Sequence, residues 1–249
     1  MPEIIMPPED STTNSGGKSM PRIIDLSQEV FQGMHVYPGH LKTVIWEHHS
    51  HEETAKNFEG GFSYQSRGLL MSDHGPTHVD ALSHLDPRPE APSIDKMPLD
   101  LFYGDATCID ISHAEPRTYI SADDLDNIVA KTGLDVRKGD ILLFYTGTFN
   151  RLHGKKEYVS DYPGLDESGS MWIFEKGIKT FGVDSPSLDN PISRTYPLHM
   201  MCRKYGITHY ENLANLDQVV GKRFTFVGFP LRIRGGTGSP VRAVAFLNE

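Results

Sequence analysis

Hydrophobic residues recur along the chain in short runs that alternate with amphipathic segments. Short runs rich in β-branched and aromatic side chains, bounded by turn residues, are typical of β-strands. Residues 140–147 are apolar enough to be buried on both faces of a sheet. The predicted strands are residues 21–27, 43–49, 106–112, 140–147, 179–185, 208–212, 223–233 and 241–247.

Three segments between these strands are expected to be helical. In the first, Ser121 is placed to cap the helix, Asp124 follows three residues later as in a capping box, and Gly133 is placed to end it. The predicted helices are residues 121–133, 168–178 and 197–207. Strands that alternate with helices in this way predict a single mixed α/β domain.

The two ends of the chain refine this expectation. The last two predicted strands are joined by RGGTGSP (residues 234–240), which has the glycine content of a phosphate-binding loop but lacks the lysine and the following helix of one. A tight turn is favoured there, and two strands joined directly by a turn argue against a purely parallel sheet. Residues 1–20 are rich in Pro, Ser, Thr and Gly and are expected to form a mobile N-terminal arm, followed by one domain over residues 21–249.

Composition narrows the class of protein. The chain has 249 residues, of which 38% are hydrophobic and 23% charged, as in ordinary globular proteins. A formal net charge of −9 disfavours nucleic acid or an anionic membrane as a partner, because both require a basic face. No apolar run is long enough to span a membrane, and the N-terminus lacks the pattern of a signal peptide. The two cysteines, Cys108 and Cys202, are expected to be reduced and buried, so a cytoplasmic enzyme is predicted.

Candidate chemistry is concentrated in SDHGPTHVDALSHLDP, residues 72–87. His74, His78, Asp80 and His84 share sequence parity, so an extended backbone would direct them to one side. Pro76 excludes a regular central strand, and the segment is therefore interpreted as a strand or turn that bends into another element. A polar surface loop, a charge-relay site and a metal site are the alternatives for this cluster.

A metal site is the favoured interpretation of the cluster. Any one of these side chains alone would be an ordinary surface residue, but four within eleven positions, flanked by apolar residues, favour a shared role. Two imidazoles and a carboxylate suit zinc, manganese or iron and leave positions open for water. A competing cluster, His48, His49 and His51 in WEHHSHEE (residues 46–53), is interpreted as a charge-rich solvated loop and not as a metal site.

The segment HGPTHVDALSH, from His74 to His84, resembles the motif of the cyclase family of metal-dependent hydrolases, which includes bacterial kynurenine formamidase and isatin hydrolase. Further similarity lies in FGVDSPSLD (181–189), LHMMCRKYGITHYENLANLD (198–217) and FVGFPLRIRGGTGSPVRAVA (226–245), so the resemblance covers roughly residues 22–246. Two positions depart from the family pattern: Pro76 stands where glycine is usual, and Leu82 where proline is usual.

The resemblance implies roles for individual residues. His84 would be the proton donor and acceptor, and Tyr37 would contact the substrate. One or two divalent ions, Mn²⁺ or Zn²⁺, would be bound, and Asp80 would bridge them if both were present. The implied ligands are His74, His78 and Asp80 for a primary ion, and His199 and Glu211 for a second ion.

The resemblance also implies a fold and an activity. The fold would be of the swivelling β/β/α type with a barrel-like mixed sheet, in a homodimer or homotetramer. The activity would be hydrolysis of a small cyclic or aryl-linked amide, such as isatin, N-formylkynurenine or a lactam, by metal-activated water. A catalytically silent metal-binding relative, or one that cyclises polyketides, is the alternative.

Overall fold

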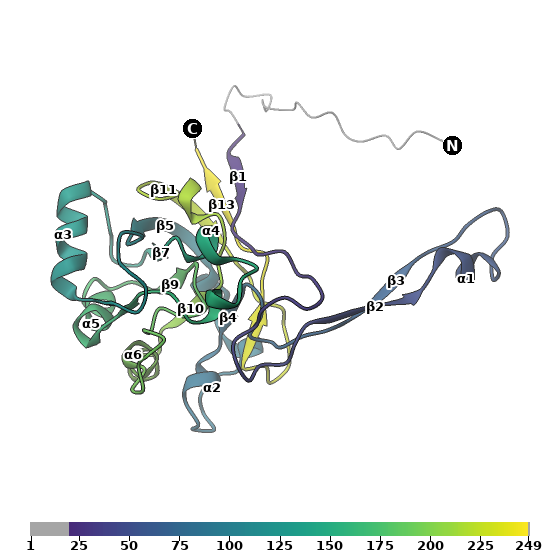
Figure 1. Cartoon of the computed structure of the whole chain (residues 1–249), viewed down its shortest axis with the longest axis horizontal. Helices are drawn as coiled ribbons and strands as arrows, with labels where there is room; N and C mark the ends of the chain where they lie inside the picture. Colours follow the sequence, from purple (N-terminus) through teal and green to yellow (C-terminus); the bar gives the residue numbers. More distant parts are fainter. Residues whose placement is uncertain (1–19, 249) are drawn as a thin grey trace.

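A nine-stranded mixed sheet forms the centre of the computed structural model, which describes residues 20–248 (Figure 1). The predicted N-terminal arm, apart from Met20, lies outside the described residues. The strand order is β1-β13-β11-β5-β7-β9-β10-β4-β12, in which β5, β7, β9 and β10 are parallel and the other pairs are antiparallel. The strands are β1 (Arg22–Asp25), β4 (His78–Asp80), β5 (Tyr103–Asp110), β7 (Ile141–Tyr145), β9 (Thr180–Val183), β10 (Thr208–Glu211), β11 (Arg223–Val227), β12 (Gly238–Pro240) and β13 (Val244–Leu247). The predicted single α/β domain with a mixed sheet is confirmed, and the sheet curls into a half-barrel.

The two faces of this sheet are covered by two separate apolar cores. On β7, Ile141 and Leu143 join one core, whereas Leu142 and Phe144 join the other, so this strand is buried on both faces as predicted. Three helices, which lie together on one side of the sheet in Figure 1, cover the second core. They are α3 (Ala122–Thr132), α5 (Glu167–Glu175) and α6 (Pro197–Tyr205).

The end signals predicted for the first of these helices are present in the structure. The Ser121 hydroxyl accepts a hydrogen bond from the backbone N–H of Asp124, and the Asp124 carboxylate accepts one from the backbone N–H of Ser121. Gly133 ends the helix with φ of 66°, a left-handed conformation that glycine adopts without strain. Both cysteines are free and buried, as expected.

The prediction for residues 223–240 is partly wrong. Strand β11 ends at Val227 rather than continuing to Ile233, because Pro230 has no N–H to donate to a neighbouring strand. Part of the predicted turn is itself a strand, β12, which pairs with β4 and covers its outer edge. The glycine-rich segment therefore leads back into the sheet at the position of the candidate site.

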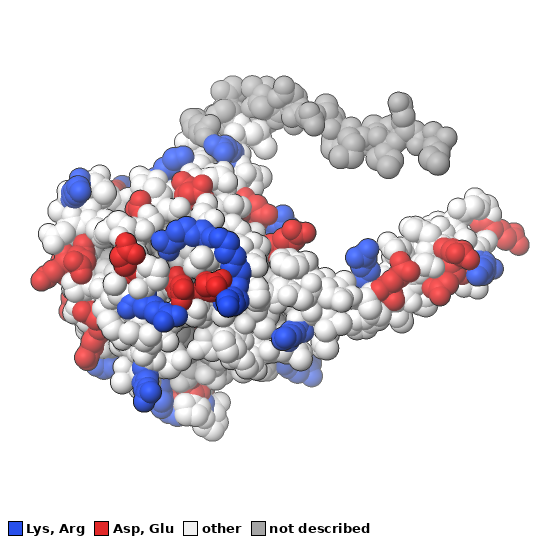
Figure 2. Space-filling view, viewed as in Figure 1, with Lys and Arg blue, Asp and Glu red and all other residues white. Residues whose placement is uncertain are grey.

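A hairpin projects from the side of the molecule opposite helices α3, α5 and α6 (Figure 1). It consists of β2 (Val44–His49), α1 (His51–Ala55) and β3 (Ser66–Leu70), which pairs with β2. The interpretation of residues 46–53 as a loop is wrong, because this segment completes a strand and begins a helix that Ser50 caps. Its side chains are mainly exposed, and both acidic and basic groups lie along the hairpin in Figure 2.

The remaining elements are short. They are α2 (Leu82–Leu85), α4 (Thr148–Leu152), the paired strands β6 (Tyr119–Ile120) and β8 (Gly164–Leu165), and the 3₁₀ helices η1 (Ile94–Lys96), η2 (Leu99–Phe102), η3 (Lys156–Val159) and η4 (Leu216–Gln218). Within residues 20–248, no helix combines the length and apolar character needed to cross a membrane.

Candidate metal centre

Strand β4 carries two of the predicted ligands, His78 and Asp80, on the same face because side chains alternate along a strand. The strand lies between β10 and β12, and its pairing with β10 places Glu211 opposite His78. His74 comes from the turn before β4, and His84 comes from α2 after it. The interpretation of this segment as a strand that bends into another element is therefore confirmed.

His74, His78 and Asp80 form a first cluster, with one potential ligand atom from each within 4.8 Å of the others. His74 Nδ1 is 2.8 Å from Asp80 Oδ1, and His78 Nε2 is 3.4 Å from the same oxygen. All three residues are buried. This arrangement brings together the primary ligands that the sequence predicted.

The glycine-rich segment before and within β12 supports His74. His74 Nε2 lies 2.9 Å from the hydroxyl of Thr237, which in turn donates to Asp73. Gly238 lies against the imidazole ring, where an added Cβ would be 2.8 Å from His74 Cε1. Glycine is required at this position by close packing on a candidate ligand, and this contact accounts for one glycine of the segment that resembled a phosphate loop.

A second cluster combines Asp80 with His199 and His209, again with one potential ligand atom from each within 4.8 Å of the others. His209 Nε2 lies 3.5 Å from Asp80 Oδ2 and 3.4 Å from Glu211 Oε1. His209 was missed by the sequence analysis. Its signal was its position two residues before Glu211 in a predicted strand, which directs both side chains to one face.

His199 is held at the start of α6 by Asp189. The Nδ1 atom of His199 lies 2.5 Å from Asp189 Oδ2, and the Asp189 carboxylate also accepts the backbone N–H groups of Leu198 and His199. Burial lowers the pKa of His199, but Asp189 and Glu211 outweigh burial and raise it to about 9. The contact with Asp189 assigns the proton of the neutral ring to Nδ1. The lone pair is then on Nε2, which lies 3.9 Å from Glu211 Oε1 and is the atom that can bind a metal.

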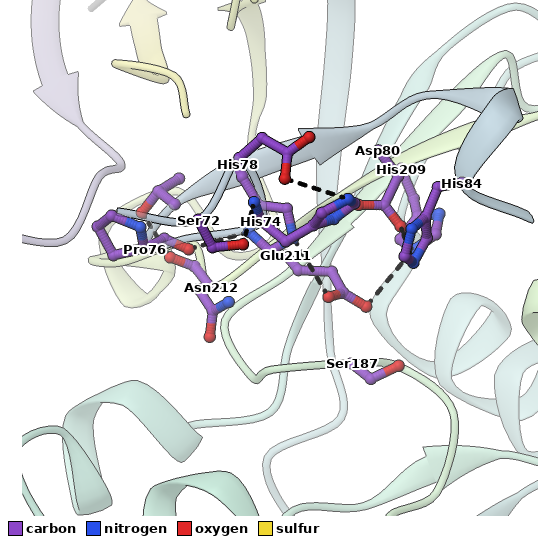
Figure 3. A network of polar contacts seen from close by, with 12 residues as sticks. Ser72, His74, Pro76, His78, Asp80, His84, Ser187, His209, Glu211 and Asn212 are labelled. Carbon is purple, nitrogen blue, oxygen red and sulfur yellow. Dashed lines mark hydrogen bonds and ion pairs between the residues drawn. The ribbon is translucent and has the colours of Figure 1, made fainter. Parts of the chain in front are cut away.

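Buried atoms without a hydrogen-bond partner gather around Asp80 (Figure 3). Of the six buried side-chain atoms without a partner in residues 20–248, three lie here: His78 Nε2, His209 Nε2 and Glu211 Oε1. His78 Nδ1 lies 3.0 Å from the carbonyl oxygen of Pro76 and donates to it, so the lone pair of a neutral ring is on Nε2. Buried polar atoms without partners are costly, and here they converge. The donor set of imidazoles and carboxylates therefore fits a divalent cation.

The carboxylates of the site are held in the ionised form. Burial raises the pKa of Asp80, but the surrounding imidazoles, His209 first, hold that pKa well below its usual range. Burial likewise raises the pKa of Glu211, whereas contacts with His209 and His78 lower it to about 2. Both residues thus present negative oxygens, as metal ligation requires.

A cavity of about 410 Å³ opens onto these clusters, and His84 lies in its wall. The His84 side chain is 35% exposed, and its Nε2 atom is 3.9 Å from Asp80 Oδ2. Burial lowers the pKa of His84 despite the opposing effect of Asp80. His84 belongs to neither of the clusters of potential ligand atoms among the described residues.

The outer wall of the cavity is aromatic. It includes Tyr37, Tyr162 and Tyr196, and the hydroxyls of Tyr37 and Tyr196 are 3.1 Å apart. The hydrogen bond with Tyr196 and partial burial raise the pKa of Tyr37 to about 12. The structure thus places Tyr37 beside the candidate centre, and its contact with a substrate stays a prediction. The competing histidines, His48 and His49 of β2 and His51 of α1, lie on the projecting hairpin, outside both clusters.

Comparisons with known proteins agree with this geometry. The model of the Cyclase family, described as "Putative cyclase", matches residues 24–190. Kynurenine formamidases from Bacillus mycoides and Bacillus cereus are 29% and 31% identical over 228 residues, which cover 89% of this chain and 95% of each relative. The chain belongs to the cyclase family of metal-dependent hydrolases, as the motif from His74 to His84 indicated.

A solved structure shows the same fold. Isatin hydrolase A from Labrenzia aggregata, determined with bound benzyl benzoate, is similar with a TM-score of 0.79 at 24% identity, over 92% of this chain and 94% of that one. The fold expected from the resemblance is therefore confirmed.

Proposed function

We propose that the protein is a metal-dependent amidohydrolase that cleaves the C–N bond of a small cyclic or aryl-linked amide. The observation that carries the proposal is the convergence of the buried, unpaired atoms of His78, His209 and Glu211 next to a cavity that Glu211 lines and that has an aromatic wall. The relatives named above, a formamidase and an isatin hydrolase, support an amide carbonyl as the reacting group.

The residues of the first cluster, His74, His78 and Asp80, are the proposed ligands of the primary ion, with His199 and Glu211 available for a second. The ion is proposed to be Mn²⁺ or Zn²⁺. When bound, such an ion lowers the pKa of a coordinated water to about 7 and polarises a carbonyl oxygen. Negative charge on Asp80 and Glu211 favours retention of a divalent cation.

His84 is the proposed proton shuttle. Because burial lowers its pKa, its imidazole is neutral near pH 7 and can accept a proton from the attacking water. The same ring then donates that proton to the leaving nitrogen, which an amide needs before its C–N bond breaks. Its place in the cavity wall supports this role.

The aromatic wall selects the shape of the substrate. The rings of Tyr37, Tyr162 and Tyr196 offer flat apolar surface for an aryl group, while the hydroxyls of Tyr37 and Tyr196 can form hydrogen bonds with polar atoms of the ligand. The size of the cavity, about 410 Å³, suits a molecule of one or two fused rings.

A panel of amides tests the proposal. The purified protein, loaded with Mn²⁺ or Zn²⁺ in separate preparations, is incubated with isatin, N-formylkynurenine, γ-lactams and cyclic imides, and the ring-opened or deformylated products are measured. Turnover of at least one amide is expected, and it should fall by about 10²- to 10⁴-fold in His84→Ala. If metal-loaded, folded protein hydrolyses none of them, the catalytically silent or polyketide-cyclising alternative replaces this proposal.

A further inference from the structure

The imidazole of His209 is buried, and one of its two ring nitrogens, Nε2, has no hydrogen-bond partner among the described residues. Its ring is stacked on Phe181, with centroids 5.0 Å apart and an interplanar angle of 3°, and its side chain is 1% exposed. Its Nδ1 atom lies 3.9 Å from the thiol sulfur of Cys202, a weak acceptor. Its Nε2 atom points to Asp80 and Glu211 and has no hydrogen-bond partner in the described part of the chain (Figure 3).

The spacing of these atoms is that of ligands around an ion. His209 Nε2 is 3.4 Å from Glu211 Oε1 and 3.5 Å from Asp80 Oδ2, both longer than the roughly 2.7–3.2 Å of an N–H···O hydrogen bond. Four ligands placed tetrahedrally at about 2.1 Å from a zinc ion would be separated by about 3.4 Å. The gap between His209 and the two carboxylates thus has the width that a shared cation fills.

We propose that His209 is itself a ligand of a second metal ion, together with His199, Asp80 and Glu211, so that this position carries two imidazoles. The inference rests on the metal centre of the proposed function and extends it, because the resemblance implied only His199 and Glu211 as additional ligands. Two nitrogen donors make the second position selective for Zn²⁺ over Mn²⁺, since imidazole binds zinc more strongly and manganese prefers oxygen.

Metal titration tests the assignment without a substrate. Metal-free wild type, His209→Phe and His209→Gln are titrated with Zn²⁺ and with Mn²⁺, and bound metal is measured by mass spectrometry after gel filtration. Phenylalanine preserves the stack on Phe181 and removes the ligand atom, and glutamine provides a smaller polar replacement if the first variant does not fold. His153→Phe applies the same change to a partly buried histidine outside both clusters.

The expected result is two Zn²⁺ per wild-type chain and one tightly bound Zn²⁺ in the His209 variants. Binding of the second Zn²⁺ should weaken by more than about 100-fold, and binding of Mn²⁺ should weaken less. Asp189→Asn serves as the control for a residue that orients a ligand without binding the metal. Such a change typically weakens metal binding by about 10- to 100-fold. His153→Phe should bind both ions as wild type does.

Several outcomes would overturn the assignment. These are a single Zn²⁺ in wild type, two Zn²⁺ with unchanged affinity in a folded His209 variant, and a loss no larger than that of Asp189→Asn, which would make His209 a positioning residue. Near-ultraviolet circular dichroism of the metal-free variants verifies the fold. Since no step measures hydrolysis, failure of the amide panel and failure of this assignment are separate results.

Discussion

Asp80 and Glu211 each direct one carboxylate oxygen to His78 and the other to His209. Asp80 places Oδ1 3.4 Å from His78 Nε2 and Oδ2 3.5 Å from His209 Nε2, whereas Glu211 places Oε2 3.5 Å from His78 and Oε1 3.4 Å from His209. The two acids thereby connect the histidine clusters, and a carboxylate in that position can bridge two ions.

Because Asp80 contacts histidines of both clusters, removing it should affect metal binding more than removing His74 or His78. His74→Ala and His78→Ala should each lose the primary ion, because the remaining side chains form a poorer chelate, and Asp80→Ala should lose bound metal from both clusters. Metal content after dialysis against metal-free buffer measures these losses. Full occupancy in all three variants would place the ligands elsewhere.

The His84→Ala variant distinguishes a role in proton transfer from a role in metal binding. His84→Ala should retain wild-type metal content while turnover falls by about 10²- to 10⁴-fold, the usual contribution of general acid–base catalysis. The loss should be smallest for amides whose leaving nitrogen is a weak base, since such a group departs with little help from an acid. Metal stoichiometry, melting temperature and rate are measured on one preparation.

Two other results would assign His84 a different role. If metal content and rate fall together and excess Mn²⁺ or Zn²⁺ restores both, His84 is a ligand. If the melting temperature falls while the rate per folded molecule is unchanged, its role is structural.

The hairpin histidines provide a matched contrast. Replacing His48, His49 and His51 together with alanine should leave metal content unchanged, because the three residues lie on a projecting hairpin outside both clusters. Elemental analysis of the triple variant beside His78→Ala is the measurement. Loss of metal from the triple variant would contradict the assignment of the site to β4 and β10.

The features that could be predicted from the sequence are those that depend on residues close together in the chain. The capping signals at Ser121 and Asp124 and the apolar run of β7 depend on neighbours in the chain, so helix α3 and a strand buried on both faces could be predicted. The candidate ligands from His74 to Asp80 are also near one another in sequence, and the spacing of His78 and Asp80 indicates a strand that directs both to one face.

Features that depend on distant pairing could not be predicted in the same way. Strand β12, Gly238–Pro240, has no intrinsic preference for a strand and forms where it pairs with β4. Strand β3 has only two apolar residues, Leu69 and Leu70, after Arg67 and Gly68, yet it pairs with β2. His209 is one histidine in a short strand, and only the pairing of β10 with β4 places it beside Asp80.

Asp184 predicts a pH dependence of stability. Burial raises its pKa to about 6, although Thr146 and the backbone N–H of Phe149 partly oppose burial by donating hydrogen bonds to the carboxylate. Between about pH 4 and pH 6 the folded state therefore binds more protons at Asp184 than the unfolded state does, and stability falls as pH rises through that range.

Relative to Asp184→Asn, the wild type should lose about 2.5 kcal/mol of unfolding free energy between pH 4 and pH 7, which follows from a pKa about two units higher in the folded state. Urea unfolding of both metal-free proteins across this range gives the difference. A constant difference at all pH values, or one that changes in favour of the wild type, would show that the buried carboxyl is not the group that titrates.

The most direct test of metal-dependent hydrolysis is to follow bound metal and turnover in one titration. Metal-free wild type is titrated with Zn²⁺ or Mn²⁺ in the presence of the amide that the panel identifies, with His78→Ala as the matched control. Turnover should rise from background as the ion occupies the centre and should level off when the centre is filled, while His78→Ala stays near background at the same metal concentrations. Equal turnover in the metal-free and metal-loaded wild type would contradict the account.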